Sequence, residues 1–268
     1  MDGLFTAAIV NTADFRENMD MHIKLIKNYE NIADGKITLF CLPYAGGGAS
    51  FYNHWVKRMQ EAFTVCPIQL PGREERIMEQ PYENMNVMLD DLEQAILNVI
   101  KAPYALWGHS MGGKIAYELE KRMEKHGYMA KCLFVSGSRA PHIPEPEPIY
   151  YLPDLAFKEK LGRFEGTPKE LLDNQELLEF FLPMLRADFT MDETYCTHTD
   201  VLLKCPIIAF GGEADREANE DEVKAWKKYT ENYFDYQMFP GGHFYVREHE
   251  EDVIHAVTKQ LWRISDEE

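Results

Sequence analysis

Residues 104–123, YALWGHSMGGKIAYELEKRM, decide the predicted fold of this 268-residue chain. The apolar run YALW predicts a buried strand, and KIAYELEKRM has the pattern of an amphipathic helix. Between them lies Gly108-His109-Ser110-Met111-Gly112, which fits Gly-X-Ser-X-Gly. Alone, this motif could be a glycine-rich turn whose serine caps a helix. The strand before it and the helix after it instead indicate a nucleophile elbow, a tight turn that presents the Ser110 hydroxyl.

Strands and helices continue to alternate on both sides of the elbow. The predicted strands are residues 37–43, 64–70, 104–110, 132–138, 206–212 and 234–240, each bounded by glycine or proline. One crossover helix is predicted from apolar residues at three- and four-residue spacing, namely Met85, Met88, Leu89, Leu92, Ile96, Val99 and Ile100. This order predicts an α/β-hydrolase fold, in which a mostly parallel central sheet carries helices on both faces.

The segment from about 140 to 200 departs from this alternation. It opens with PHIPEPEPIYYLP at 141–153, where closely spaced prolines exclude a regular helix. Helical patterns follow at 155–161 and 171–185. We therefore expect an inserted helical lid within a single domain that covers residues 36–263.

Residues 1–35 are expected to form an N-terminal extension of that domain. Their sequence is compatible with a strand at 4–10 and an amphipathic helix near 15–29, and it carries no recognisable chemistry.

Two late glycine turns supply candidates for a base and an acid. PIIAFGGEAD at 206–215 ends in Glu213 and Asp215, and FDYQMFPGGHF at 234–244 places His243 after the last strand. Serine, acid and histidine follow one another in this order in α/β-hydrolases. We predict that Ser110, His243 and Asp215 form a catalytic triad, with Glu213 as the alternative acid. His109 is expected to be structural, because neighbouring side chains on an elbow point apart.

The oxyanion of the reaction needs two backbone amide donors. The amide of Met111 begins the helix after the elbow, where the helix dipole favours negative charge. Pro43-Tyr44-Ala45-Gly46-Gly47-Gly48 follows the first main strand. We predict that Ala45 is the second donor, with Gly46 as the next candidate. A phosphate-binding loop is excluded, because no Gly-Lys-Ser/Thr follows.

Composition narrows the possible partners. The formal net charge of −17 argues against binding to nucleic acid or to an anionic membrane surface. No apolar run approaches the roughly 20 residues of a membrane span, and the start of the chain lacks the pattern of a secretory signal. A cytoplasmic location is therefore expected. Five scattered cysteines without a Cys-X-X-Cys pair suggest neither disulfides nor a zinc site.

Several spaced motifs resemble those of the type II thioesterases that accompany nonribosomal peptide and polyketide synthases. The motifs are LPYAGGGASFY at 42–52, QLPGREER at 69–76, WGHSMGG at 107–113, SGSRAPH at 136–142, FFLPMLRADF at 180–189 and PGGHF at 240–244. The resemblance covers about residues 36–263. It implies a Ser110, Asp215 and His243 triad, oxyanion donors at Ala45 and Met111, and no cofactor.

The resemblance also implies a substrate and a partner. The substrate would be an acyl group on the phosphopantetheine arm of an acyl or peptidyl carrier protein. Because carrier proteins are generally acidic, basic residues are candidates for a docking patch, namely Lys57, Arg58, Arg73, Arg76 and Lys114. For each one, a scattered solvated charge is an equally good interpretation. Alternative functions are a carboxylesterase or acyl-CoA thioesterase that acts on free small substrates, and a release domain that cyclises its product.

Overall fold

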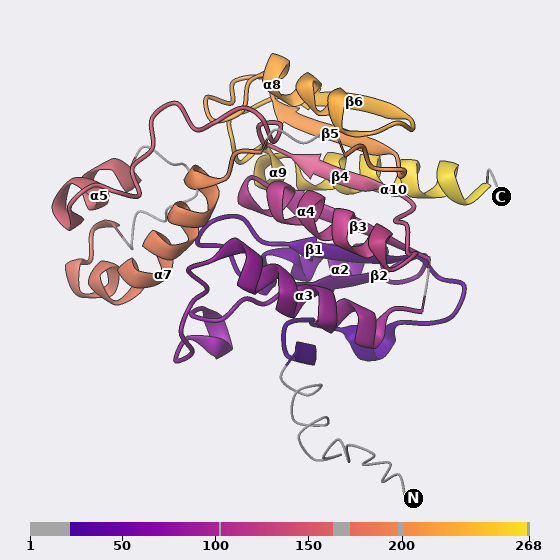
Figure 1. Ribbon diagram of the computed structural model, residues 1–268, viewed down its shortest axis with the longest axis horizontal. Coiled ribbons are helices and arrows are strands. Elements are labelled where there is room, and N and C mark those ends of the chain that lie inside the picture. Colours follow the sequence, from indigo (N-terminus) through magenta and orange to yellow (C-terminus); the bar gives the residue numbers. More distant parts are fainter. Residues whose placement is uncertain (1–21, 102, 163–171, 198–200, 267–268) are drawn as a thin grey trace, which may run out of the picture.

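A computed structural model describes residues 22–101, 103–162, 172–197 and 201–266. Its centre is a six-stranded sheet in the order β2-β1-β3-β4-β5-β6 (Figure 1). The strands are β1 (Thr38–Leu42), β2 (Thr64–Pro67), β3 (Tyr104–His109), β4 (Leu133–Ser136), β5 (Ile207–Gly212) and β6 (Phe234–Phe239). Every pair of neighbouring strands is parallel. The predicted parallel sheet is confirmed, and each strand lies within the range expected from the sequence.

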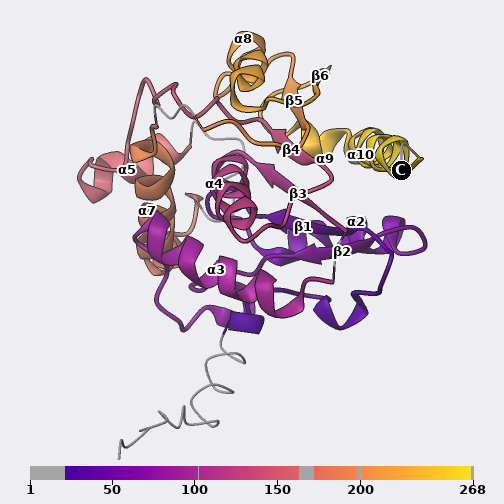
Figure 2. The ribbon, with the colours of Figure 1, turned by 45° about the vertical axis from the view of Figure 1, so that its right-hand side comes forward.

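Helices cover both faces of the sheet, because its central strands are apolar on both sides. In β1, Phe40 and Leu42 belong to a core formed with α3 and α4, whereas Leu39 and Cys41 belong to a core formed with α2 and α10. Figure 2 shows α3 and α4 on one face of the sheet and α10 on the other. The helices of these layers are α2 (Asn53–Met59), α3 (Met85–Val99), α4 (Met111–Lys125), α8 (Glu220–Lys224), α9 (Tyr245–Glu248) and α10 (Glu250–Asp266).

Short 3₁₀ turns complete the connections: η1 (Tyr29–Asn31), η2 (Ala49–Tyr52), η3 (Glu74–Arg76) and η4 (Ala225–Tyr229). Helix α3 begins where the Asn84 side chain accepts hydrogen bonds from the amides of Asn86 and Val87. Its buried face includes Met88 and Leu92, as the apolar spacing predicts.

In its described residues, the chain between β4 and β5 carries two helices, α5 (Asp154–Leu161) and α7 (Gln175–Thr194), which lie beside one end of the sheet (Figure 1). We call this segment the helical insertion. It has a hydrophobic cluster of its own, which includes Phe157, Leu182 and Phe189. Helix α7 ends nine residues later than the expected residue 185, because its apolar face continues through Phe189 and Met191.

The helix expected near residues 15–29 is wrong from residue 24 onward, whereas His22 and Ile23 are helical. Beyond residue 23 the chain forms turns, and Ile26 makes an antiparallel bridge to Ile68. Asn28 adopts a left-handed conformation (φ 62°) and donates from Nδ2 to the Val65 carbonyl at 2.9 Å. Because Leu25, Ile26 and Ile32 are buried in the main core, residues 22–35 pack as part of the domain. The strand expected at 4–10 lies outside the described residues.

Within the part of the chain that the structure describes, no helix is long and apolar enough to cross a membrane. Four of the five cysteines are buried and Cys196 is exposed, and all five are free thiols.

A buried carboxyl group joins α4 to the sheet. Glu120 is fully buried, accepts a hydrogen bond from the Tyr104 hydroxyl at 2.7 Å, and accepts another from the Ala130 amide at 2.8 Å. Burial raises the pKa of Glu120 from 4.5 to about 8, and these two hydrogen bonds oppose the rise only in part. The folded protein therefore binds a proton that the unfolded chain releases at lower pH.

This proton makes a pH-dependent contribution to stability. Because the pKa is higher in the folded state, the contribution of Glu120 falls as the pH rises from about 4.5 and levels off above about 8. Glu120→Gln keeps both hydrogen-bonding positions and removes the titration. We predict that its free energy of unfolding, relative to wild type, increases between pH 5 and pH 9 by on the order of a few kcal/mol. Urea unfolding at several pH values measures this, with the exposed Glu61→Gln as control. A pH-independent difference would contradict the assignment.

Candidate active site

The turn between β3 and α4 holds Ser110 in a backbone conformation that is rare for residues other than glycine, with φ 55° and ψ −121°. Two close backbone approaches make this turn possible. A Cβ atom at Gly108 would lie 2.0 Å from the Gly112 carbonyl oxygen, and one at Gly112 would lie 2.5 Å from the Leu42 carbonyl oxygen. Both glycines of the motif are therefore required by space, and they present Ser110 at the N-terminus of α4.

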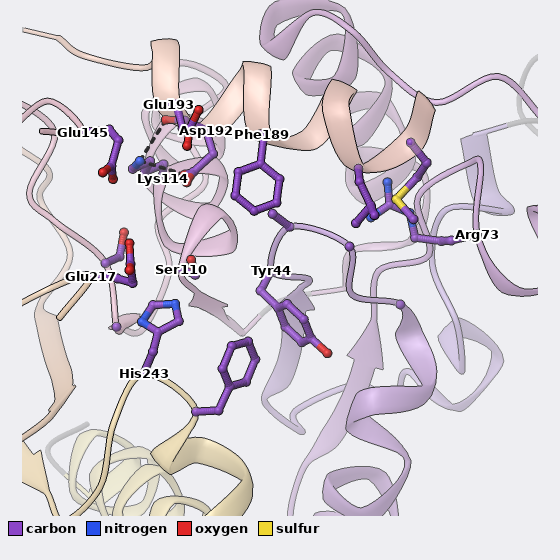
Figure 3. A pocket seen from close by; sticks show the side chains of 18 of the residues that line it. Tyr44, Arg73, Ser110, Lys114, Glu145, Phe189, Asp192, Glu193, Glu217 and His243 are labelled. Atoms are coloured by element: carbon purple, nitrogen blue, oxygen red, sulfur yellow. Dashed lines mark hydrogen bonds and ion pairs between the residues drawn. The ribbon is translucent and has the colours of Figure 1, made fainter. Parts of the chain in front are cut away.

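The carboxyl ends of β5 and β6 bring Asp215 and His243 together. Asp215 Oδ2 lies 2.9 Å from His243 Nδ1, and Asp215 Oδ1 accepts from the amides of Glu217 at 2.7 Å and Ala218 at 3.2 Å. The Asp215 carboxylate is thus buried and fixed on both oxygens. Glu213, the alternative acid of the sequence, is exposed on the same loop. Ser110 and His243 line the same cavity (Figure 3).

Opposing influences set the charge of His243. Burial by itself lowers the pKa of His243, but the hydrogen bond and the negative charge of Asp215 outweigh it, assisted by Glu217 and Asp192. The pKa is therefore raised above 6.5. A proton accepted by this imidazole is stabilised by the carboxylate behind it.

His109 is close to His243, with ring centroids 4.9 Å apart, but its surroundings differ. Its Nδ1 lies 2.9 Å from Ser136 Oγ, and Ser136 in turn bonds to the Tyr245 hydroxyl. Burial, His243 and Arg247 hold the pKa of His109 well below 6.5. A neutral, fully buried histidine that is bonded to the core is structural.

The two candidate oxyanion amides differ from their neighbour Gly46. In the described part of the chain, neither the Ala45 amide nor the Met111 amide is engaged in a hydrogen bond. The Gly46 amide donates to Asp188 Oδ2 at 2.7 Å. Gly46 is therefore unavailable as a donor, and the geometry favours Ala45 over the second candidate of the sequence.

The cavity over Ser110 has a volume of about 470 Å³ and two kinds of wall. Helix α7 contributes an apolar wall, made of Leu177, Phe181, Met184, Leu185 and Phe189. A charged wall combines Lys114, Arg139, Glu145, Asp192, Glu193 and Glu217. Lys114 Nζ lies 2.7 Å from Asp192 Oδ1, and this ion pair links α4 to α7 (Figure 3). A cavity of this size and lining suits an elongated, partly apolar ligand.

Three of the five basic residues considered for a docking patch are buried, so the prediction is wrong for them. Arg73 pairs with Asp188, Arg76 with Glu79, and Lys114 with Asp192. Arg73, Arg76 and Lys114 are 3%, 9% and 6% exposed. Lys57 and Arg58 are exposed on α2, and Arg58 pairs with Glu251. Their carboxylate partners are known only from the structure, because the sequence does not show which charged side chains meet.

Sequence reasoning also missed Asp188, which accepts a hydrogen bond from the Gly46 amide, and Glu193, which lines the cavity. Both are carboxylates among the buried positions of α7. That pattern, an acidic residue on an otherwise apolar helical face, is the signal that could have found them.

Comparison with known proteins extends these observations. The chain is 40% identical over 228 residues to the gramicidin S biosynthesis protein GrsT of Aneurinibacillus migulanus. The matched region covers 84% of this chain and 89% of GrsT. The structure of BorB, a type II thioesterase from the borrelidin biosynthetic cluster, matches with a TM-score of 0.81 and 32% identity, over 89% of this chain and 98% of BorB. ClbQ from the colibactin NRPS/PKS pathway matches with a TM-score of 0.82 and 34% identity, over 87% of this chain and all of ClbQ.

The model of the thioesterase domain family matches residues 37–261, a range that includes all six strands, the elbow, the helical insertion and both late glycine turns. The chain therefore belongs to the thioesterase domain family.

Proposed function

We propose that this thioesterase uses Ser110 as nucleophile and His243 as general base. Asp215 orients the imidazole and stabilises its protonated form. The observation that carries the proposal is the buried contact of 2.9 Å between Asp215 Oδ2 and His243 Nδ1, at the edge of the cavity that Ser110 also lines. The strained backbone of Ser110 supports it, because such strain persists where function requires it.

In the proposed mechanism, His243 accepts the Ser110 hydroxyl proton while Ser110 Oγ attacks the thioester carbonyl carbon. The amides of Ala45 and Met111 donate hydrogen bonds to the oxyanion of the tetrahedral intermediate. The intermediate expels the thiolate, which takes the proton from His243. Water, deprotonated by the same imidazole, then attacks the acyl-enzyme and releases the carboxylic acid and free Ser110. These steps balance with protein groups and water, so the proposed reaction needs no metal or redox cofactor.

We propose further that the thioester is carried on the phosphopantetheine arm of an acyl or peptidyl carrier protein. ClbQ is named as part of an NRPS/PKS pathway, and BorB is named as a type II thioesterase of a biosynthetic cluster. Removal of aberrant acyl groups would restore such a synthase to activity. The apolar wall that α7 gives the cavity suits an acyl group. A cytoplasmic location, which the sequence predicts, fits a partner of this kind.

The nucleophile is tested by substitution. We predict that Ser110→Ala folds normally and lowers turnover of an acyl thioester by roughly 10³ to 10⁶-fold. A fluorophosphonate should label the wild type covalently and leave the variant unlabelled, as read by intact-protein mass spectrometry. Covalent labelling of a residue other than Ser110, or near-normal turnover of the variant, would contradict the serine mechanism.

The role of Asp215 is tested by pH dependence. Because Asp215 raises the pKa of His243 against burial, the acidic limb of the wild-type kcat/KM profile should lie above pH 6.5. Asp215→Asn removes that influence, so we predict that the limb moves to lower pH while plateau activity falls by about 10³ to 10⁴-fold, since the imidazole loses its orientation. Glu213→Gln is the matched control on the same loop and should keep the wild-type profile. If Glu213→Gln shows the larger loss, the acid is assigned incorrectly.

The carrier is tested by comparing substrates. We predict that short acyl groups on a carrier protein are hydrolysed with kcat/KM at least about tenfold above the same groups on free pantetheine, a difference of about 1.4 kcal/mol in transition-state binding. Acyl-CoA and p-nitrophenyl esters complete the series. Equal values for carrier-bound and free substrates would favour the alternative, an enzyme that acts on free small esters or thioesters.

A further inference from the structure

An ion pair between Arg73 and Asp188 lies beside the oxyanion loop, which we define as residues 44–48. The Arg73 guanidinium makes two parallel contacts with the Asp188 carboxylate, Nη1 to Oδ2 at 2.7 Å and Nη2 to Oδ1 at 2.8 Å. The two side chains are 4% and 0% exposed. Arg73 immediately precedes η3, whereas Asp188 lies on α7, so the pair joins the hydrolase core to the helical insertion.

The same two side chains hold the oxyanion loop. Asp188 Oδ2 accepts a hydrogen bond from the Gly46 amide at 2.7 Å, and Arg73 Nη1 donates to the Gly47 carbonyl at 3.0 Å. Both bonds act on the residues that directly follow Ala45. Gly46 has φ 78°, and a Cβ there would lie 2.8 Å from Leu185 Cδ2, so α7 also packs closely on the loop.

Stability alone does not account for this arrangement. A buried ion pair loses so much hydration that well-packed apolar residues in its place are often equally stable or more stable. Two parallel hydrogen bonds do, however, fix the orientation of the guanidinium relative to the carboxylate. Peptide groups that are hydrogen-bonded to such a pair cannot rotate freely. The orientation of a donor amide in turn decides how well it stabilises an oxyanion.

We propose that Arg73 and Asp188 are positioning residues, which hold the oxyanion loop against α7 so that the Ala45 amide points to the oxyanion formed over Ser110. The inference rests on the proposed function, since it assigns the loop that role. It also makes α7 part of the catalytic geometry as well as a wall of the cavity.

The experiment compares Asp188→Asn with Asp154→Asn. Asp154 on α5 pairs with Arg186 on α7 at 2.7 Å, so the control breaks another aspartate–arginine contact of the insertion without touching the loop. We expect Asp188→Asn to lower kcat by about 10 to 100-fold with KM within about threefold of wild type, somewhat less than the loss of a whole oxyanion donor. Asp154→Asn should retain wild-type kcat.

A second readout separates positioning from stability. A trifluoromethyl ketone analogue of the acyl thioester forms a tetrahedral adduct with the serine, and its affinity reports on the oxyanion site. Its Ki should rise in Asp188→Asn by the same factor as kcat falls. The double variant Arg73→Met/Asp188→Leu replaces the pair with apolar side chains. It provides the test if the single variant does not fold. We expect it to unfold near the wild-type temperature yet to keep the loss of kcat and inhibitor affinity.

The proposal is overturned if a folded variant has kcat and Ki within twofold of wild type, or if KM alone changes. It is also overturned if the double variant recovers activity together with stability. Fluorophosphonate labelling of wild-type Ser110 is measured first. Absence of that label would refute the proposed serine mechanism, whereas a labelled wild type with unaffected variants would refute only the role of the pair.

Discussion

The close backbone approach between β3 and α4 is the constraint on which the rest of the site depends. Space for a Cβ is missing at both Gly108 and Gly112, because the chain turns from the centre of the sheet directly into a helix that crosses β1. This turn places Ser110 with positive φ at the carboxyl edge of the central strand. Loops that follow the neighbouring strands then reach the same edge, as they do in parallel α/β sheets generally.

Electrostatic effects at this edge depend on burial as much as on charge. His109 and His243 are both buried and have neighbouring rings, yet their pKa values move in opposite directions. The difference is Asp215, whose carboxylate accepts from His243 and is itself fixed by two backbone amides. The Asp215 carboxylate is thus the reason that His243 is suited to proton transfer whereas His109 stays neutral.

The helical insertion is bound to the hydrolase core by buried charge. Arg73 meets Asp188 and Lys114 meets Asp192, so two ion pairs join the C-terminal half of α7 to the core beneath it. Apolar residues of the same helix line the cavity. The helix that lines the cavity therefore also contacts the loop that is proposed to bind the oxyanion, through the hydrogen bond from the Gly46 amide to Asp188.

Local pattern in the sequence was sufficient to predict the six strands, the parallel sheet and the positions of Ser110, Asp215 and His243 within their turns. Periodicity and glycine placement act over a few residues, so one sequence contains them. Contacts over long sequence separations decided the rest. The Gly46 amide is not free to donate elsewhere, because it is hydrogen-bonded to Asp188, which lies 142 residues later in the chain. Arg73 is buried in an ion pair with the same aspartate, from which it is separated by 115 residues. Leu25, Ile26 and Ile32 belong to the core, and a bridge between Ile26 and Ile68 joins their segment to the domain. Burial and pairing of a polar group depend on which distant segments pack around it, and only the tertiary structure brings those segments together.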